Sequence, residues 1–483
     1  MDVTMTTPQK HYNHRNNNRR PQQRQADVQV EIGQRFPLTI KRIGINGEGI
    51  GYYKRKLVFI KGALPTEVVV AEVIGIKPNF LTAKIHRIKT PSKDRVTPRD
   101  AYADQVGGFE LEHLAYPAQL DFKRDVIAQS LEKYKPHGYK HYELKPTIGM
   151  DNPYAYRNKA QFQVRKTAEG QVIAGLYEEN SHNLVDLATC SVQMPATMAV
   201  MRFIVSQLQD LNVAIYDERH ETGLVKTVIV RVAAKTDEIQ VVFVTTERAF
   251  PQSDDLVSSL QAKFPNIVSI MQNINPVKTS LIWGDETIRL AGKSQIREEL
   301  KGLAFNLSAR AFLQLNPYQT VKLYDEALKA LDLGENENVV DAYAGVGTIG
   351  LSVAHAAHEV RGMDIIPDAV KDANENAALN GITNAHYETG KAEDVIPRWV
   401  DEGFSFDALI VDPPRTGLDD WLIRTILETT PKKFVYISCN PSTLARDLKE
   451  LTTEYHVDYI QSVDMMPQTP RCEAVVKFTR AEY

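Results

Sequence analysis

The pattern of apolar and polar residues changes several times along the chain. Residues 1–29 are rich in Asn, Gln and Arg and contain almost no large apolar side chain. Such a segment cannot bury a core, so we predict a disordered basic tail there. Between residues 30 and 90, short runs such as KLVFI and EVVVAEVIGI are separated by Gly, Asn and Pro turns. That spacing is typical of a small β-barrel.

After residue 90 the pattern predicts two different mixtures of helices and strands. Up to about residue 290, strand runs such as TVIVRVA alternate irregularly with helical runs such as MAVMRFIVSQLQDL, which predicts an α+β domain. From about residue 338 the alternation becomes regular, and regular alternation implies a Rossmann-like, doubly wound parallel sheet. The predicted fold class is therefore multidomain α/β, with an OB-like barrel, a central α+β domain and a C-terminal Rossmann-like domain.

A glycine loop follows the first strand of the regular region, in the run DAYAGVGTIGL. Gly345 and Gly347 there would let a ligand approach the backbone closely, and Asp364, 19 residues after Gly345, ends the next strand. A carboxylate at that position suits ribose hydroxyls, so NAD and S-adenosylmethionine both remain open. Asp341, just before the loop, favours S-adenosylmethionine because a carboxylate attracts a cationic cofactor.

A second motif, LIVDPPRTG, ends an apolar strand at Asp412. The carboxyl ends of strands in open α/β sheets face the ligand crevice. We therefore expect Asp412 to point into the site as an acceptor for a cofactor or a base. The alternative is an ordinary turn that terminates the strand.

Two further residues suit covalent chemistry. Cys439 lies between the strand run FVYIS and a helical pattern, where a helix N-terminus and Arg415 or Arg446 would lower the pKa of a nucleophilic thiol. Glu473 enters the run EAVVKFTR and is a candidate general base. The alternatives are a buried small side chain and a solvated carboxylate. If Glu473 points into the site, strand alternation turns Cys472 away from it.

Charge is distributed unevenly along the chain. Residues 1–100 carry 19 Lys and Arg against 8 Asp and Glu, a net charge of +11, which leaves −15 for the rest of a chain whose total is −4. This asymmetry indicates a polyanionic partner, the alternative being a solvated basic surface. Basic and aromatic side chains occur together in the barrel, a combination that suits RNA. The candidates are Lys41, Arg42, Tyr52, Lys54, Arg55 and Lys56.

Composition narrows the cellular setting. The chain is 43% hydrophobic and 24% charged, as globular proteins are. No apolar run reaches the roughly 18 residues needed to span a bilayer, and no apolar export signal begins the chain. Three cysteines form no disulfide framework. We expect a monomer in a reducing cytoplasm, with no membrane partner.

Together, these motifs resemble those of the RNA (uracil-5-)-methyltransferase family, and GINGEGIGY resembles the TRAM domain, an RNA-binding module. The resemblance rests on QLN, DAYAGVGTIGL, DPPRTG, SCNPSTLARDL and DMMPQTPRCE, in that order. It implies Cys439 as nucleophile, Glu473 as general base and S-adenosylmethionine as methyl donor. The implied cofactor contacts are Gln314, Tyr343, Gly345, Gly347, Asp364 and Asp412. The expected domains are an RNA-binding barrel at 30–90, a central RNA-binding domain at 91–111 and 144–290, and a catalytic domain at 112–143 and 291–483.

The chain departs from the family where many members bind an iron–sulfur cluster. Their ligands are a C-x5-C-G-G-C run and a later cysteine, but here Asp100, Val106 and Phe109 lie at the matching positions, and only Cys190 remains. One thiolate cannot hold a cluster that needs about four. We therefore expect no iron–sulfur cluster and no other metal, with packing of Val106 and Phe109 in its place.

The function that the resemblance implies is methylation of C5 of a specific uridine in RNA through a covalent bond between Cys439 and C6. Members with this N-terminal barrel often act on 23S rRNA, which we take as the first expectation, with tRNA as the alternative. A methyltransferase acting on nitrogen or on protein would need no cysteine. A non-catalytic RNA-binding or ribosome assembly factor would need neither Cys439 nor Glu473. An NAD-linked oxidoreductase is the least favoured of these alternatives.

Overall fold

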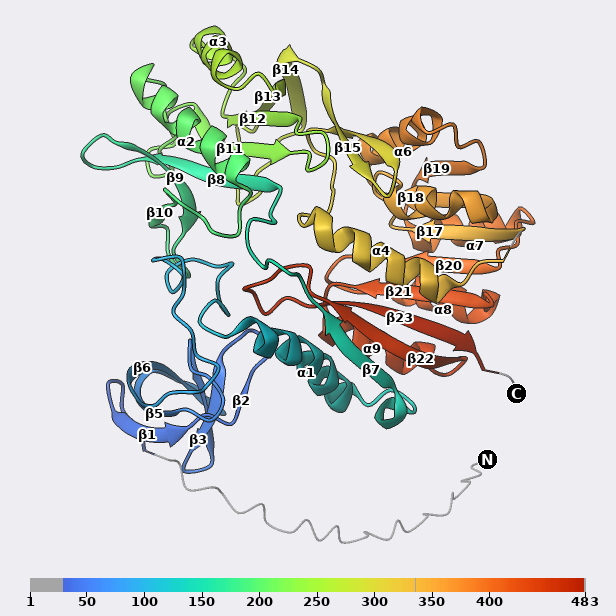
Figure 1. Cartoon of the computed structure of the whole chain (residues 1–483), viewed down its shortest axis with the longest axis horizontal. Coiled ribbons are helices and arrows are strands. Elements are labelled where there is room, and N and C mark those ends of the chain that lie inside the picture. Colours follow the sequence, from blue (N-terminus) through green and yellow to red (C-terminus); the bar gives the residue numbers. More distant parts are fainter. Residues whose placement is uncertain (1–28, 335, 482–483) are drawn as a thin grey trace, which may run out of the picture.

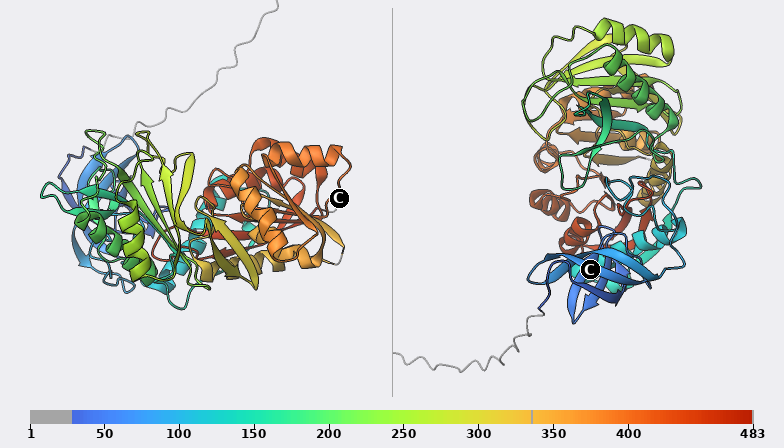
Figure 2. Two further views of the ribbon diagram at one scale, coloured as in Figure 1. Left: turned by 90° about the horizontal axis from the view of Figure 1, so that it is seen from above. Right: turned by 90° about the vertical axis from the view of Figure 1, so that its left-hand side faces the viewer.

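The computed structural model describes residues 29–334 and 336–481, so all but the last residue of the predicted tail lies outside the described residues. The chain folds into three bodies (Figure 1). The N-terminal barrel and the central domain lie at one end of the molecule and the C-terminal domain lies at the other, as Figure 2 also shows. In the described part of the chain, no helix is both long and apolar enough to cross a membrane.

The barrel is a six-stranded sheet with the strand order β1-β5-β6-β4-β3-β2. Buried and exposed residues alternate along β1, which places Phe36 and Leu38 in the barrel core. The sheet closes where the Lys41 backbone N–H donates to the Ile50 carbonyl over 2.7 Å. The strands are β1 (Arg35–Thr39), β2 (Arg42–Ile43), β3 (Gly49–Tyr53), β4 (Lys56–Ile60), β5 (Val68–Ile76) and β6 (Phe80–Thr90).

The central domain is a mixed seven-stranded sheet with the order β10-β9-β8-β11-β12-β13-β14, in which only β12 and β13 pair in parallel. Apolar residues of α2 and α3 pack on one face of this sheet. The other face carries polar side chains of β8, including Lys159, Gln161 and Gln163, which are only half-buried. The elements are β8 (Lys159–Lys166), β9 (Val172–Tyr177), β10 (Leu184–Asp186), α2 (Pro195–Asp210), β11 (Val225–Val232), β12 (Ile239–Thr245), α3 (Ser253–Lys263), β13 (Ile267–Ile274) and β14 (Glu286–Gly292).

A hairpin, β15 (Gln295–Leu300) and β16 (Leu303–Ser308), leads into the C-terminal domain. That domain has an eight-stranded sheet with the order β19-β18-β17-β20-β21-β23-β22-β7. The strands are β7 (Glu143–Ile148), β17 (Glu337–Ala342), β18 (Ala357–Asp364), β19 (Ala385–Thr389), β20 (Ala408–Val411), β21 (Lys433–Ser438), β22 (Tyr455–Val463) and β23 (Glu473–Arg480). Neighbours from β19 to β21 pair in parallel, whereas β23 runs antiparallel to both β21 and β22.

Helices cover both faces of this sheet, as the doubly wound prediction requires. Apolar side chains of α4, α5 and α6 pack on one face, and those of α1, α7, α8 and α9 pack on the other. The helices are α1 (Tyr116–Tyr134), α4 (Pro317–Leu331), α5 (Thr348–Val353), α6 (Pro367–Leu379), α7 (Ala392–Asp401), α8 (Asp420–Thr429) and α9 (Pro441–Leu451), with short 3-10 turns at Tyr139–His141 and Ala354–Ala356. The predicted fold class is confirmed.

Strand β7 belongs to the C-terminal sheet, although it precedes the whole central domain in the sequence. It pairs in parallel with β22, and the Gln461 side chain donates to the Pro146 carbonyl over 2.7 Å. The expected domain boundary at residue 144 therefore falls inside a strand of the C-terminal sheet. A strand whose partner lies 315 residues away leaves no periodicity from which its sheet can be inferred.

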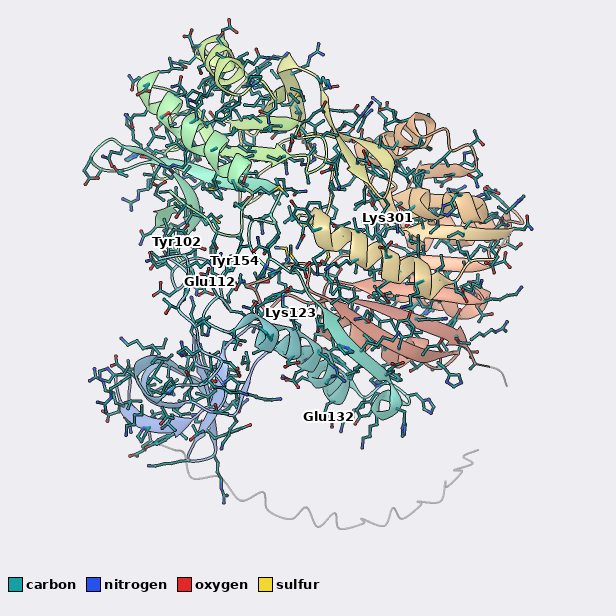
Figure 3. The ribbon with its side chains drawn as sticks, in the orientation of Figure 1. Tyr102, Glu112, Lys123, Glu132, Tyr154 and Lys301 are labelled. Atoms are coloured by element: carbon teal, nitrogen blue, oxygen red, sulfur yellow. The ribbon has the colours of Figure 1, made fainter. Side chains whose placement is uncertain are left out.

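A buried ion pair joins α1 to the segment between β22 and β23. The side chains of Lys123 and Asp464 are both fully buried, and the ammonium donates to Asp464 Oδ1 and, over 3.0 Å, to the Met466 carbonyl. The Tyr116 hydroxyl donates to Asp464 Oδ2 over 2.8 Å. Figure 3 shows Lys123 on the face of α1 turned toward the rest of the molecule. Because every charge here is paired and hydrogen-bonded, this segment is held in one position.

Further contacts fix the same segment from two other directions. The Gln119 amide of α1 donates to the Gln468 side chain over 2.8 Å and accepts from the Gln468 backbone over 3.0 Å. From the central domain, the Tyr156 hydroxyl donates to the Pro467 carbonyl over 2.8 Å. The Asn316 side chain, which caps α4, donates to the Met465 carbonyl over 3.1 Å. The segment that leads into Glu473 is thus a junction between the domains.

Replacing Lys123 by Met should lower the free energy of unfolding by about 3–5 kcal/mol, because Asp464 would be left buried without its partner. Urea unfolding followed by circular dichroism measures this. Arg124→Met is the matched control, since Arg124 is exposed on the same helix and should change stability by less than about 0.5 kcal/mol. Equal effects of the two substitutions would show that the buried pair is not what holds the junction.

Candidate functional site

The predicted site residues lie along one edge of the C-terminal sheet. Tyr343, Asp412 and Cys439 directly follow β17, β20 and β21, while Asp364 is the last residue of β18. These four strands are parallel, so their carboxyl ends meet at the same edge. Glu473 begins β23, which runs the opposite way, and it therefore reaches that edge too.

The glycine loop after β17 is shaped by its backbone. The Gly345 N–H donates to Asp364 Oδ2 over 3.0 Å, and the Ile366 N–H donates to Asp364 Oδ1 over 2.9 Å. The φ angle of Gly345 is 56°, and a Cβ atom there would have no heavy atom within 4 Å, so the space beside it is open to a ligand. Tyr343 has a φ of 66°, a conformation that non-glycine residues seldom adopt and that often marks functional sites.

Asp341 lies beneath this loop. It is fully buried, and its Oδ2 accepts from the Gly350 N–H over 2.8 Å. Its other oxygen has no hydrogen-bond partner among the described residues, and burial, more than the nearby carboxylates, raises its pKa to about 7. Asp341 does not line the cavity described next, so its observed contact is with the loop backbone.

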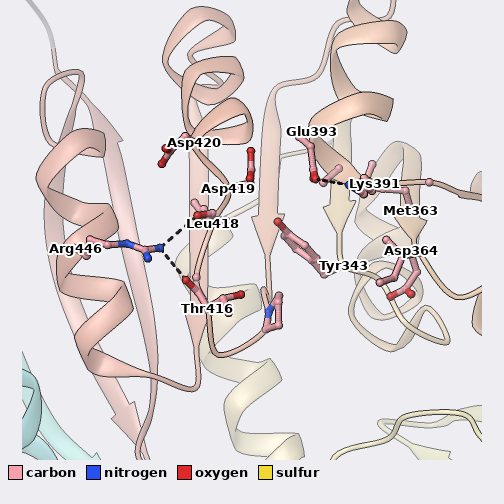
Figure 4. A pocket seen from close by; sticks show the side chains of 15 residues that line it. Tyr343, Met363, Asp364, Lys391, Glu393, Thr416, Leu418, Asp419, Asp420 and Arg446 are labelled. Carbon is pink, nitrogen blue, oxygen red and sulfur yellow. Dashed lines mark hydrogen bonds and ion pairs between the residues drawn. The ribbon is translucent and has the colours of Figure 1, made fainter.

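A cavity of about 440 Å³ opens beside the loop (Figure 4). Tyr343, Asp364 and Ile365 line one part of it, and Ile365 is 64% exposed, an apolar surface on which a flat ring could lie. Pro414 lines another part, and Arg446 closes the far side through a bond of 2.8 Å to the Thr416 carbonyl. An acidic strand end, open glycine backbone and an exposed apolar side chain together suit a nucleoside.

Cys439 and Glu473 face each other across two strands. Strands β21 and β23 pair antiparallel up to Ser438 opposite Ala474, Cys439 and Glu473 are the next residues beyond that pair, and the charge of Glu473 acts on Cys439. Both residues are half-buried, whereas Cys472 is only 2% exposed and packs in the core beneath the sheet. The alternation expected for Cys472 is therefore present.

The chemistry of the thiol differs from the expectation. Burial, followed by the charges of Glu473 and Asp412, raises the pKa of Cys439 to about 11, and Arg415 offsets only part of this. Arg446 cannot help, because it pairs with Asp447 over 2.7 Å and bonds to backbone carbonyls. The predicted lowering of the Cys439 pKa is therefore wrong for the protein without its ligands. At neutral pH Cys439 is a protonated thiol.

The two neighbouring carboxyl groups are also perturbed. Burial and then the charge of Asp412 raise the pKa of Glu473 to about 8, against smaller opposing effects of Lys123 and Arg415. Burial raises the pKa of Asp412 to about 7. Neither side chain has a hydrogen-bond partner among the residues that the structure describes. Paired acids with raised pKa values in a crevice are typical of sites that exchange protons.

Gln314 lies apart from this cavity, in the half-buried run that leads into α4. Its carbonyl accepts from the Asn158 side chain of the central domain over 3.3 Å, and the next carbonyl, of Leu315, accepts from the Asn158 N–H over 2.9 Å. Phe312, two residues before Gln314, is 59% exposed, an aromatic surface that the sequence analysis did not single out. The QLN motif is thus a link between the central domain and the sheet edge.

The RNA candidates of the barrel form a separate group. Lys41, Arg42, Lys54 and Arg55 are exposed, Tyr52 is 53% exposed and Lys56 is half-buried. Lys54 and Arg55 form the turn between β3 and β4, both with positive φ. Arg42 donates a hydrogen bond of 3.2 Å to Gln129 on α1. The loop between β2 and β3 brings the barrel against the segment before Glu473, because a Cβ atom on Gly47 would lie 3.6 Å from the Pro470 Cβ.

The positions that match iron–sulfur ligands in other proteins come together in space. Val106, Phe109 and Cys190 belong to one apolar cluster of the central domain. Asp100 instead accepts from the Ser191 N–H over 3.1 Å and from the Ser191 hydroxyl. Residues 29–334 and 336–481 contain no group of three or more His, Cys, Asp or Glu that could hold a metal ion. Residues 100–109 are therefore joined to the segment around Cys190 by apolar packing and hydrogen bonds.

The sequence analysis missed several charged residues close to the site. Lys123, which holds the segment before Glu473, was not singled out, and Asp464 was quoted only as the first residue of DMMPQTPRCE, without a role. Arg157 and Lys159 flank Asn158, beside the QLN motif, and Lys159 lies opposite Arg231 of β11. The one available signal was the run YRNKAQFQVRK, which places several basic residues in an otherwise strand-like stretch.

Comparison with known proteins gives a consistent picture. The model of the tRNA (Uracil-5-)-methyltransferase family matches residues 115–481, and that of the TRAM domain matches residues 29–86. An uncharacterised RNA methyltransferase of Lactiplantibacillus plantarum is 65% identical, over 97% of this chain and 98% of its own length. One from Enterococcus faecalis is 55% identical, over 93% and 99%.

A solved structure is similar over nearly its whole length. It is the Pyrococcus abyssi tRNA (uracil-54, C5)-methyltransferase in complex with S-adenosyl-L-homocysteine. The two proteins are 27% identical, the match covers 92% of this chain and 99% of the other, and the TM-score is 0.73. The match to the family model alone covers about three quarters of the chain. The chain therefore belongs to the tRNA (uracil-5-)-methyltransferase family and is an RNA methyltransferase.

Proposed function

We propose that this protein methylates C5 of a uridine in RNA, using S-adenosylmethionine, with Cys439 as nucleophile and Glu473 as general base. The observation that carries the proposal is the register of β21 and β23, which brings the thiol and the carboxyl together just beyond the last pair of the two strands, at the ligand edge of the sheet. Attack at C6 and removal of a proton from the adjacent C5 need a nucleophile and a base close to each other.

The cofactor fits the cavity beside the glycine loop. Asp364 and Ile365 would hold the ribose and the adenine, since a carboxylate suits ribose hydroxyls and an exposed apolar side chain suits a flat ring. The open backbone at Gly345 would take the amino-acid part, Gly347 would shape the loop beside Tyr387, and Tyr343 and Asp412 follow β17 and β20 at the same edge as Cys439. We also assign Gln314 to this site through the family resemblance. The bound cofactor supplies the methyl group.

The protein's own residues carry the other steps. C5 of uracil is a weak nucleophile, and addition of the Cys439 sulfur to C6 makes C5 electron-rich. The thiol proton leaves as the C–S bond forms, and the Asp412 carboxylate, whose charge also acts on Cys439, is its acceptor, which keeps the Glu473 carboxylate free for the C5 proton. After C5 has taken the methyl group, Glu473 removes the C5 proton. Cleavage of the C–S bond then restores the double bond and releases Cys439, so that one difficult reaction becomes several easier ones.

The raised pKa values suit this sequence of events. A thiol held at a pKa of about 11 is not a free thiolate at rest, so it resists oxidation and side reactions until uracil is bound. Glu473, with a pKa of about 8, can both accept and return a proton near neutral pH. The uridine must leave its stack to reach this edge, and single-stranded loops are the RNA elements from which a base is most easily extruded.

For the substrate we propose 23S rRNA, on the resemblance to members with the same N-terminal barrel, and with tRNA as the second candidate. The similarity to the Pyrococcus abyssi tRNA enzyme favours tRNA. We also propose a monomeric, cytoplasmic enzyme without an iron–sulfur cluster. The barrel residues, among them Lys41, Arg42 and Tyr52, would hold RNA at a distance from the target base. The alternative that is not an enzyme, a non-catalytic RNA-binding or assembly factor, would bind the same RNA without methyl transfer.

Cys439→Ala should lower kcat by on the order of a thousandfold or more, because no covalent addition to C6 can occur. Transfer of tritiated methyl groups to RNA measures kcat, and calorimetry should show unchanged binding of S-adenosylmethionine. Cys190→Ala is the control, since that thiol lies in the core of the central domain and should keep near-normal activity. Normal turnover by Cys439→Ala would contradict the nucleophile assignment.

Glu473→Gln should lower kcat by about 10²–10⁴ and let a covalent protein–RNA adduct accumulate, because the C5 proton then has no base. The adduct would be seen as a band of reduced mobility in a denaturing gel. In the native enzyme kcat/KM should rise with pH and level off above about pH 8, since Glu473 must be deprotonated to act. A flat pH profile, together with an active Glu473→Gln enzyme free of adduct, would exclude this role.

Deletion of the gene should remove 5-methyluridine from one class of RNA. Nucleoside analysis by mass spectrometry of purified 23S rRNA and of total tRNA compares the two candidates directly. We expect the loss in 23S rRNA. A loss confined to tRNA would select the alternative substrate, and unchanged 5-methyluridine in both, with no transfer in vitro, would favour the non-catalytic factor.

A further inference from the structure

Five basic side chains of the central domain and of the sheet edge form no ion pair within the described part of the chain. Arg157, Lys159 and Arg231 come from the central domain, and Arg415 and Arg471 come from the segments after Asp412 and before Glu473. The absence of ion pairs from these five holds against all described residues, 29–334 and 336–481. The field of Arg415 and of Arg157 reaches Arg471, whose pKa is lowered by burial first and by these charges next. Because the charge of Arg157 also acts on Lys159, Arg157 connects the cations of the central domain with those of the sheet edge.

Lys159 and Arg231 are two positive charges that repel each other at close range. They are directly opposed across β8 and β11, so both side chains point to the same face of the central sheet. Like charges in this arrangement are destabilising. Arg231 cannot turn away, because it is only 4% exposed and its guanidinium donates to the Ala311 carbonyl over 2.6 Å. A third cation, Arg157, lies two residues from Lys159 and donates to its carbonyl over 3.4 Å.

Lys159 is the member of this group that is free to bind. Its ammonium has no hydrogen-bond partner within residues 29–334 and 336–481, whereas Arg231 is occupied by backbone carbonyls. Burial, followed by the charges of Arg231 and Arg157, lowers the pKa of Lys159 to about 7. A bound anion would offset the repulsion from Arg231 and Arg157 and the loss of solvation on burial. It would also accept the hydrogen bonds for which the Lys159 ammonium has no partner among the described residues.

The position of the group indicates which anion it serves. Asn158, between Arg157 and Lys159, bonds to the carbonyls of Gln314 and Leu315, and so ties the group to the QLN motif next to the sheet edge. A site for a free metabolite would be expected inside a closed cavity, but Lys159 lies on β8, whose side chains on this face are only half-buried, beside β11, which is buried along its whole length. An extended polyanion that passes between the central domain and Cys439 meets the group directly.

We propose that Arg157, Lys159 and Arg231 form a binding site for a backbone phosphate of the RNA, beside the nucleotide whose base enters the active site. This inference rests on the proposed function for its choice of RNA. Lys159 and Arg157 donate hydrogen bonds to the phosphate oxygens. Arg231, buried on the neighbouring strand β11, adds positive charge without contacting the phosphate. A phosphate held here fixes the backbone while the base leaves its stack, which makes the site a positioning device as well as a source of affinity.

The experiment compares Lys159→Gln with the wild-type enzyme, in binding of a fluorescein-labelled stem–loop RNA with uridines in its loop. Fluorescence anisotropy without S-adenosylmethionine, over a series of salt concentrations, gives the Kd and its salt dependence. We expect the Kd to rise about tenfold and the slope of log K against log salt to become shallower by about 0.7–0.9, the value for one phosphate contact. Lys159→Arg keeps the charge and should bind RNA nearly as the wild type does.

Two controls separate binding from folding. Lys263→Gln removes an exposed lysine from the end of α3, on the covered side of the same sheet, and should leave the Kd and the salt slope unchanged. The Tm of Lys159→Gln without RNA should not fall, because the substitution breaks no hydrogen bond and removes a repulsion with Arg231. Lower RNA affinity with an equal or higher Tm supports the proposal.

An unchanged Kd and salt slope in Lys159→Gln would overturn the phosphate site. Because binding is measured without the methyl donor, this outcome is independent of the covalent mechanism. If Lys159→Gln loses RNA affinity while Cys439→Ala turns over normally, the phosphate site stands and the nucleophile assignment fails. If the wild-type enzyme itself binds neither the stem–loop nor purified ribosomal RNA and tRNA, both the phosphate site and the proposed function are wrong.

Discussion

The buried pair of Lys123 and Asp464 is the constraint on which the geometry of the site depends. It joins α1, from the first third of the chain, to the segment that leads into Glu473. Gln119, Tyr156 and Asn316 hold the same segment from α1, from the central domain and from α4. A carboxyl placed opposite a thiol must keep its distance and angle to act, and a junction fixed from three directions provides that rigidity. The domains of this protein therefore meet at the site itself.

Much of the fold was predictable because its signals are local. Strand runs with turn residues identified the barrel, and regular alternation identified the doubly wound sheet. The glycine loop, Asp412 and Cys439 could be found because each follows directly on a strand in the sequence. Lys123 and Lys159 could not be found in this way. Their meaning depends on partners in other elements, Asp464 at 341 residues and Arg231 across a strand pair, and a single sequence does not display such pairings.

The pKa values of the site residues could not be predicted from the sequence either. A thiol before a helix, near two arginines, was expected to have a lowered pKa. In the folded chain, burial and the carboxyl groups of Glu473 and Asp412 outweigh Arg415, and Arg446 is committed to Asp447. The balance of these effects depends on which groups are desolvated together, which follows from the register of β21, β20 and β23. Reactivity at Cys439 is thus a property of the complex with substrate more than of the free protein.

The place of β7 in the C-terminal sheet has a consequence for how the protein is made. Helix α1 and β7 leave the ribosome long before β22 and the Asp464 segment, with the whole central domain synthesised in between. At roughly 5–20 residues per second, α1 waits on the order of tens of seconds with the charge of Lys123 still lacking its partner. The barrel and the central domain can fold in that time, whereas the active site assembles only when the last strands arrive. An incomplete chain would therefore be able to meet RNA before it was able to modify it.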